Sequence, residues 1–142
     1  MTRDALVSSA ISHWAPRFVS NGVLLADFEE VTAGIERWED WCGAWCERAE
    51  IHQALGREAL SQGYRLTAGE HLVRAAMYYH FGKFLFVHDQ KQMRAAHARA
   101  LGCYNDALAL MRPAGERIAI PAGRDQAELM RRENSPDSGD CP

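Results

Sequence analysis

Apolar residues recur at spacings of three and four along most of the chain, which is the pattern of amphipathic helices. Turn-forming residues divide this pattern into five predicted helices, at about residues 4–13, 27–35, 38–62, 67–86 and 89–112. Pro16 is expected to end the first helix, because proline lacks a backbone donor and disfavours helix in the residue before it. The sequence therefore predicts a mainly α protein, built as a bundle of about five helices.

Capping residues support several of these boundaries. Asp27 with Glu30, and Thr67 with Glu70, have the spacing of a capping box, so each pair predicts the start of a helix. Asp89 is expected to cap the last helix. Gly63 stands where a left-handed C-terminal cap is expected.

Two of the predicted helices have the composition of buried elements. The third carries an apolar stripe at helical spacing, formed by Trp38, Trp41, Trp45, Ala49, His52, Leu55 and Ala59. This spacing favours core packing over a ligand platform, so we expect Trp41 and Trp45 to be structural. The fourth helix is apolar on nearly all sides, which is typical of a central helix.

The pattern changes after the last helix. Residues 116–122 alternate between polar and apolar side chains, which predicts one short strand. Residues 123–142 contain few apolar side chains and are predicted to be a disordered tail. We therefore divide the chain into a helical domain at 1–113, a single strand at 114–122 and the tail at 123–142.

Composition and charge exclude several classes of protein. The 142 residues are 47% apolar and 25% charged, with a formal net charge of −3. This balance argues against a nucleic-acid partner. We find no stretch of about 20 apolar residues and no secretory leader, so we expect no membrane association and a cytoplasmic location. Four cysteines would then be reduced thiols.

The sequence contains no complete catalytic motif. None of its serines lies in a G-x-S-x-G motif, and it has neither a phosphate-binding glycine loop nor an H-E-x-x-H motif. Its six histidines are scattered and do not suggest a metal site. Cys42 and Cys46 could share a soft metal, but their place beside the tryptophan stripe favours small apolar fillers. We predict no catalytic residue, no metal and no cofactor.

The segment 77–84 places polar groups in an otherwise apolar helix. Tyr79, His80 and Lys83 need hydrogen-bonding partners if they are buried, or else a pocket that uses them. Gly82 would let a ligand or another backbone approach closely. A substrate pocket wall and a satisfied core network are both compatible with this pattern.

Several of these segments, in this order, resemble the N-terminal helical cap of α/β-hydrolases similar to 2,6-dihydroxypseudooxynicotine hydrolase and the fermentation–respiration switch protein. The resemblance covers about residues 24–121 and depends on residues 26–31, 38–42, 69–76, 78–86, 104–110 and 116–121. It implies a helical region that precedes a hydrolase core and packs over its active site. Ester hydrolysis and hydrolytic C–C cleavage are among the reactions that it implies, each by attack of a serine on a carbonyl.

The sequence departs from this pattern where the hydrolase core should begin. No position matches a nucleophile, acid or histidine of the family, so we interpret the chain as a cap fragment that lacks its core and is inactive alone. Tyr79, His80 and Phe84 are expected to face a small carbonyl substrate. The face that would dock on the core is expected to cause self-association. The alternative is a stand-alone helical interaction module, and a small-molecule sensor is a weaker third interpretation.

Overall fold

Helices form all the regular secondary structure in the part of the chain that the structure describes. The computed structural model describes residues 3–119. In chain order, the elements are α1 (Ala5–Ser20), α2 (Leu25–Ala33), a short 3-10 helix η1 (Trp38–Asp40), α3 (Trp41–Ser61), α4 (Arg65–Lys83) and α5 (Gln90–Leu108). The predicted mainly α architecture of about five helices is confirmed for these residues.

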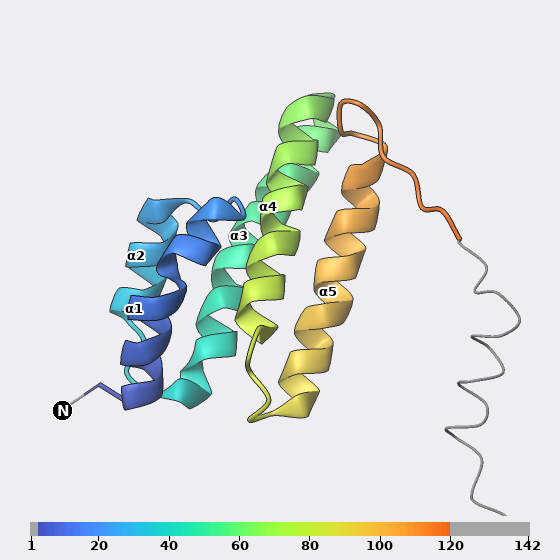
Figure 1. The fold of residues 1–142 in the computed structure, drawn as a ribbon. Helices are drawn as coiled ribbons and strands as arrows, with labels where there is room; N and C mark the ends of the chain where they lie inside the picture. The colour runs from blue at the N-terminus through green and yellow to red at the C-terminus, as the bar shows by residue number, and fades with distance from the viewer. Residues whose placement is uncertain (1–2, 120–142) are drawn as a thin grey trace, which may run out of the picture.

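Three long helices form the main body of the fold. Helices α3, α4 and α5 run alternately up and down beside one another, with α4 in the middle (Figure 1). The position of α4 explains its composition, because a helix with a neighbour on each side has little surface left for polar residues. Tyr78, Tyr79 and Ala75 on α4 have no exposed surface.

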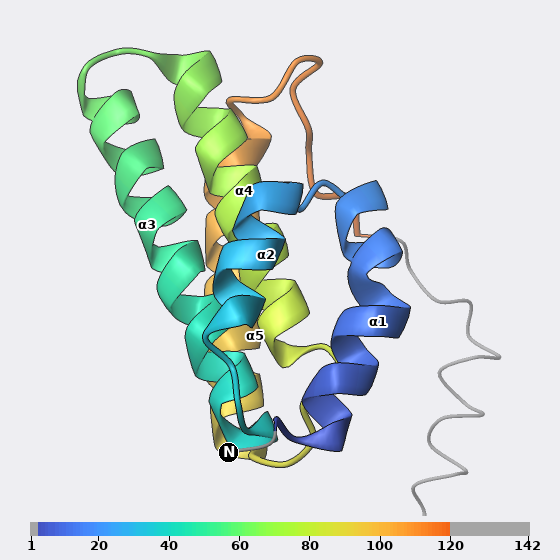
Figure 2. The same ribbon diagram turned by 90° about the vertical axis from the view of Figure 1, so that its left-hand side faces the viewer.

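The shorter helices α1 and α2 pack together across α3 and α4 (Figure 2). An aromatic cluster fills the space between them and the long helices. Phe18 of α1 stacks on Phe81 of α4 with a centroid distance of 3.9 Å, and meets Phe28 of α2 edge-to-face at 5.4 Å. Trp41 and Trp45 are almost fully buried in this cluster, as their spacing predicted.

Helix α1 does not end at Pro16, and this part of the sequence prediction is wrong. The helix continues to Ser20, with Pro16 inside it. Proline within a helix costs about 3 kcal/mol through the lost hydrogen bond and the steric clash. Packing beyond Pro16 offsets this cost, since Phe18 is 1% exposed and contacts aromatic rings from three other helices.

Two predicted capping boxes are also wrong. Helix α2 begins two residues before Asp27, and α4 begins two residues before Thr67, in both cases without a side-chain cap. The carboxylate of Asp27 instead accepts hydrogen bonds from distant side chains. The third predicted helix is divided as well, because residues 38–40 form η1 before α3 begins.

Other predicted boundaries are confirmed. Gly63 has a φ of +84°, the left-handed conformation expected after α3. Oδ1 of Asp89 accepts hydrogen bonds from the backbone N–H groups of Lys91 and Gln92 at 2.9 and 3.0 Å, which caps α5. Helices α4 and α5 nevertheless end at Lys83 and Leu108, three or four residues earlier than predicted.

The C-terminal prediction is tested only in part. Residues 114–119 form no strand, whereas residues 120–122 and the tail at 123–142 lie outside the described residues. The predicted strand and tail therefore stay predictions. Within residues 3–119, no helix combines the length and the hydropathy needed to cross a membrane.

Candidate functional site

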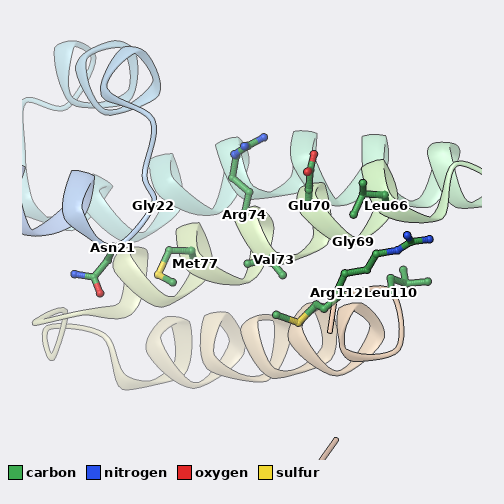
Figure 3. A pocket seen from close by; sticks show the side chains of 11 residues that line it. Asn21, Gly22, Leu66, Gly69, Glu70, Val73, Arg74, Met77, Leu110 and Arg112 are labelled. Atoms are coloured by element: carbon green, nitrogen blue, oxygen red, sulfur yellow. The ribbon is translucent and has the colours of Figure 1, made fainter. Parts of the chain in front are cut away.

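A groove runs along the surface of α4, and its larger part is a cavity of about 440 Å³ (Figure 3). Apolar side chains from α4 and from the segment after α5 form much of its lining, namely Leu66, Val73, Met77, Leu110 and Met111. Charged groups also line it, since Glu70, Arg74 and Arg112 contribute side chains. Asn21 and Gly22, between α1 and α2, form the opposite end.

A second cavity of about 300 Å³ continues the first toward the C-terminal end of α4. The two cavities share Asn21, Val73 and Met77, so we treat them as one feature and call it the α4–α5 groove. Volumes of this size are typical of small-molecule sites. The α1–α2 turn is one wall of the groove along both cavities.

Small side chains create the second cavity. Ala76 on α4 and Ala100 on α5 line it and are 6% and 8% exposed, so larger residues at either position would fill the space. His80, His97 and Tyr104 place polar atoms at its exposed edge. An apolar space with imidazole and phenol groups at its opening suits a small, partly apolar ligand that bears an oxygen acceptor.

His80 is suited to hydrogen bonding as a neutral group. Partial burial lowers its pKa below the usual histidine value, and the charges of Lys83 and His97 lower it further. A neutral imidazole offers one N–H donor and one acceptor nitrogen.

The three residues predicted to face the substrate lie in different surroundings. His80 lines the α4–α5 groove, and the ring of Phe84 lies 6.0 Å from its imidazole. Tyr79 is on another side of α4, fully buried, and its hydroxyl donates a hydrogen bond of 2.9 Å to Oε1 of Gln53 on α3. The guanidinium of Arg99 lies 4.5 Å from the centre of the Tyr79 ring. Thus the structure brings His80 and Phe84 together and places Tyr79 apart from both.

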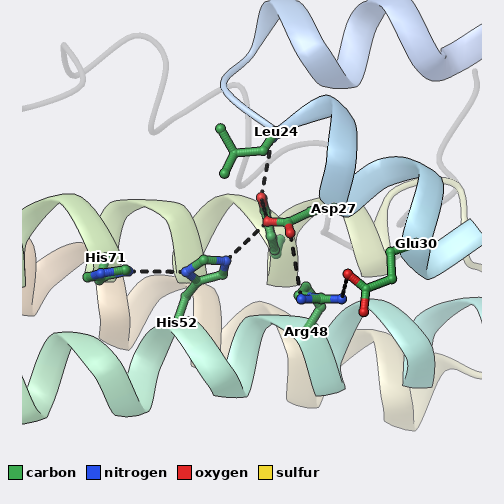
Figure 4. Close-up of polar contacts among 7 residues, drawn as sticks. Leu24, Asp27, Glu30, Arg48, His52 and His71 are labelled. Atoms are coloured by element: carbon green, nitrogen blue, oxygen red, sulfur yellow. Dashed lines mark hydrogen bonds and ion pairs between the residues drawn. The ribbon is translucent and has the colours of Figure 1, made fainter.

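A polar network joins α2, α3 and α4 (Figure 4). Oδ2 of Asp27 accepts hydrogen bonds from the hydroxyl of Tyr78 and from Nε2 of His52, the latter at 3.2 Å. Nδ1 of His52 lies 3.1 Å from Nδ1 of His71. Arg48 forms ion pairs with Asp27, at 3.6 Å, and with Glu30.

The network fixes the protonation of its members. Hydrogen bonds from Tyr78 and His52, together with the charge of Arg48, hold the pKa of Asp27 below its usual value despite the opposing effect of burial. Burial lowers the pKa of His52, while Asp27 acts in the opposite direction. Burial and the hydrogen bond to Asp27 also raise the pKa of Tyr78. Asp27 is therefore the anionic centre of the network at neutral pH.

The residue numbers of His52 and His71 gave no indication that the two imidazoles are in contact. One signal was available in the sequence. His52 belongs to the apolar stripe of the third predicted helix, and a buried histidine requires polar partners. The identity of those partners depends on how three helices pack, so no local pattern predicts it.

Comparison with curated proteins connects part of the chain to hydrolases. The α/β hydrolase pydG of Acremonium sp is 29% identical over 94 residues, which are 65% of this chain and 22% of that protein. The α/β hydrolase xenA of Xenoacremonium sinensis is 30% identical over 73 residues, or 51% of this chain and 17% of that protein. The α/β hydrolase gkaG of Penicillium citrinum is 24% identical over 94 residues, again 65% and 22% of the two chains.

The chain thus contains a region related to α/β hydrolases, which confirms the resemblance inferred from its motifs. It spans about a fifth of the length of these relatives. It matches no protein-family profile. No solved structure matches it significantly.

Proposed function

We propose that residues 1–113 are the helical cap of an α/β-hydrolase and that this chain does not catalyse hydrolysis alone. The main support is the relationship to proteins named α/β hydrolases over a stretch that is only 17–22% of their length. The all-helical fold of the described residues agrees with a cap. The absence of G-x-S-x-G from the 142 residues supports the second part of the proposal, since that motif carries the nucleophile in such enzymes.

In this proposal the α4–α5 groove is the part of the cap that contacts substrate. The substrate is a small carbonyl compound, an ester or a ketone, whose oxygen accepts hydrogen bonds from His80 or His97. Phe84 contributes apolar surface beside His80, and Tyr79 supports the packing of α4 from the opposite side. The cap excludes water from the reacting carbonyl and positions it for a serine that this chain does not supply.

An esterase assay tests the inactivity of the chain. Purified protein is mixed with p-nitrophenyl butyrate, with and without a serine-directed phosphonate. We expect no turnover that the phosphonate removes. Phosphonate-sensitive turnover would contradict the proposal, because it would require a serine nucleophile within these 142 residues.

Ligand binding tests the role of the groove. Acetophenone serves as a carbonyl probe that cannot be hydrolysed, and its binding is followed through the NMR signals of His80 and His97. We expect these signals to shift, and Ala100→Leu to abolish the shifts by filling the cavity. Ala98→Leu is the matched control, since Ala98 is an exposed residue of the same helix that does not line the groove. Unchanged shifts in Ala100→Leu would contradict a site in the groove.

A stand-alone interaction module is the second candidate. One observation favours it: the described residues bury a continuous core of 19 side chains without a second domain. Leu24, Leu25, Leu101 and Tyr104 are at least 45% exposed and offer apolar surface for a different partner protein. Sedimentation separates the candidates. Concentration-dependent self-association supports the cap with an uncovered docking face, whereas a monomer that melts cooperatively supports the module.

A further inference from the structure

An arginine near the end of α1 is held by two aromatic rings beside the α4–α5 groove. The guanidinium carbon of Arg17 lies 5.2 Å from the centre of the Trp14 ring and 5.8 Å from the centre of the Phe84 ring. The two rings meet edge-to-face at 5.3 Å, so both α1 and α4 define where the guanidinium lies. Within residues 3–119, no carboxylate forms an ion pair with Arg17.

Contact with aromatic rings leaves the hydrogen-bonding groups of a guanidinium available. The cation is attracted to the faces of the rings, whereas its N–H donors lie at the edge of the guanidinium plane, in a fork that matches a carboxylate. Among the hydrogen bonds of the described residues, Arg17 takes part only through its backbone. Its side chain is also exposed. Arg17 can therefore donate two parallel hydrogen bonds to a carboxylate from solution.

Two neighbouring residues connect Arg17 with the second cavity of the groove. The side-chain amide of Asn21, which lines both cavities, donates a hydrogen bond of 2.7 Å to the carbonyl oxygen of Arg17. The two residues are one helical turn apart, or about 6 Å along α1. On α4, the ring of Phe84 lies 6.0 Å from the imidazole of His80, which lines the second cavity. A carboxylate at Arg17 can thus belong to a ligand whose apolar part occupies this cavity.

The other charge at this end of the groove has the same sign as Arg17. Lys83, in the last turn of α4, is close enough to His80 to lower the pKa of that imidazole, and no carboxylate of the described residues opposes this effect. The acidic residue of the groove lining, Glu70, borders the first cavity and not the second. Because the whole chain has a formal net charge of −3, this positive region is a local property. A positive border beside an apolar cavity favours an anionic, partly apolar ligand.

We propose that Arg17, with Lys83 nearby, is an anion-binding position of the groove, which selects ligands that carry a carboxylate on a short arm beside an apolar body. The carboxylate binds at the edge of the Arg17 guanidinium, and the apolar body fills the second cavity. The identity of the substrate rests on the proposed function. It becomes an oxo acid, or the half-ester of a dicarboxylic acid, whose carbonyl oxygen lies at His80 or His97.

A ligand without a ketone or an ester tests the anion-binding position alone. The probe is 4-phenylbutyrate, and 4-phenylbutan-1-ol is its uncharged match with the same apolar body. NMR titration of the wild-type protein at pH 7.5 measures the affinity for each compound. We expect the carboxylate to bind about tenfold more tightly than the alcohol, because it gains a charge-assisted contact, and added salt to reduce this preference. Equal affinity for the two compounds would overturn the proposal.

The variant Arg17→Gln separates recognition of the charge from a structural role of Arg17. It should lose the preference for 4-phenylbutyrate and keep the wild-type affinity for the alcohol, because the cavity itself is unchanged. Arg57→Gln is the matched control and should keep the preference, since Arg57 is an exposed residue of α3 that lines neither cavity. A preference that persists in Arg17→Gln would refute the proposal, as would an equal loss of affinity for both compounds.

The same titrations distinguish this inference from the proposed function. If 4-phenylbutyrate binds through Arg17 and acetophenone does not bind, the anion-binding position is supported and the carbonyl site is overturned. If acetophenone binds and 4-phenylbutyrate shows no preference over its alcohol, the proposed function stands and the anion-binding position is overturned.

Discussion

Gly82 on α4 and Trp45 on α3 are so close that no side chain fits between the two helices at this point. A Cβ atom at Gly82 would lie 2.9 Å from Cβ of Trp45 and 3.3 Å from the carbonyl oxygen of Cys42. The sequence allowed either a ligand or another backbone to approach this glycine. The structure shows that it is the backbone of α3.

This contact makes Gly82→Ala destabilising despite the higher helix propensity of alanine. We expect the free energy of unfolding to fall by about 1–3 kcal/mol, because α3 and α4 must move apart. Gly102→Ala is the matched control. A Cβ there meets nothing within 4 Å, so the same change in the interior of α5 should stabilise the protein by about 0.5–1 kcal/mol. Urea denaturation of both variants measures the difference, and equal effects would contradict the packing described here.

Asp89 and Thr67 distinguish a real helix cap from an apparent one. Asp89 caps α5, whereas Thr67 lies inside the first turn of α4 and makes no capping hydrogen bond. We expect Asp89→Ala to lower the melting temperature by about 4 °C and Thr67→Ala to change it by less than about 1 °C. Circular dichroism measures both values. A larger decrease of the melting temperature in Thr67→Ala would indicate that Thr67 caps α4, as the sequence predicted.

Stability should decrease as the pH falls below about 6.5, the ordinary pKa of histidine. The pKa of His52 is lower in the folded protein than in the unfolded chain, so the unfolded chain binds more protons in this range. Asp27, whose folded pKa is also lowered, adds a further loss below its ordinary value of 3.8. Urea titrations from pH 7.5 to 3 measure the slope of the free energy of unfolding against pH.

The variant His52→Gln separates this effect from the titration of other groups. We expect it to lower stability at pH 7, because the hydrogen bond to Asp27 changes, and to flatten the dependence between pH 6.5 and 5. His13→Gln removes an exposed histidine and should leave the slope unchanged. A wild-type slope in His52→Gln would show that other groups control the pH dependence.

Tyr79→Phe separates a packing role from a binding role. It removes the hydrogen bond to Gln53 and should lower the free energy of unfolding by about 1 kcal/mol. Because Tyr79 does not line the groove, acetophenone affinity should be unchanged. His80→Gln should instead weaken acetophenone binding with little effect on stability. NMR titration of both variants with acetophenone tests this contrast. Weaker acetophenone binding by Tyr79→Phe would indicate that Tyr79 contacts the ligand, and would contradict a packing role alone.

Local signals in the sequence predicted much of the fold. Periodicity located the five α-helices of residues 3–119. Gly63 and Asp89 marked true boundaries, because each acts through its own backbone or through nearby N–H groups. Pro16 gave a wrong helix end, because the tertiary packing of Phe18 outweighs the local cost of a proline inside α1. Asp27 gave a wrong capping prediction, because its carboxylate accepts hydrogen bonds from His52 and Tyr78, which are 25 and 51 positions away in the sequence.

Fewer residues of the candidate site than of the fold could be predicted from local patterns in the sequence. His80 belongs to an apolar helix where a polar residue is conspicuous, and it does line the groove. His97 and Tyr104 line the same groove as His80 only because α5 packs beside α4. The helical periodicity of either segment alone does not predict which faces of the two helices are in contact. The contact between His52 and His71 likewise depends on the packing of α3 against α4.

The alanines that form the floor of the α4–α5 groove also affect how the protein can change over evolutionary time. Ala76 and Ala100 each lie within a long helix, where exchange for valine or leucine alters cavity volume more than it alters the backbone. In the proposed function, an exchange at either position therefore changes the shape of the ligand that the groove accepts. Two positions within an otherwise unchanged helical framework would then set the selectivity of the proposed site.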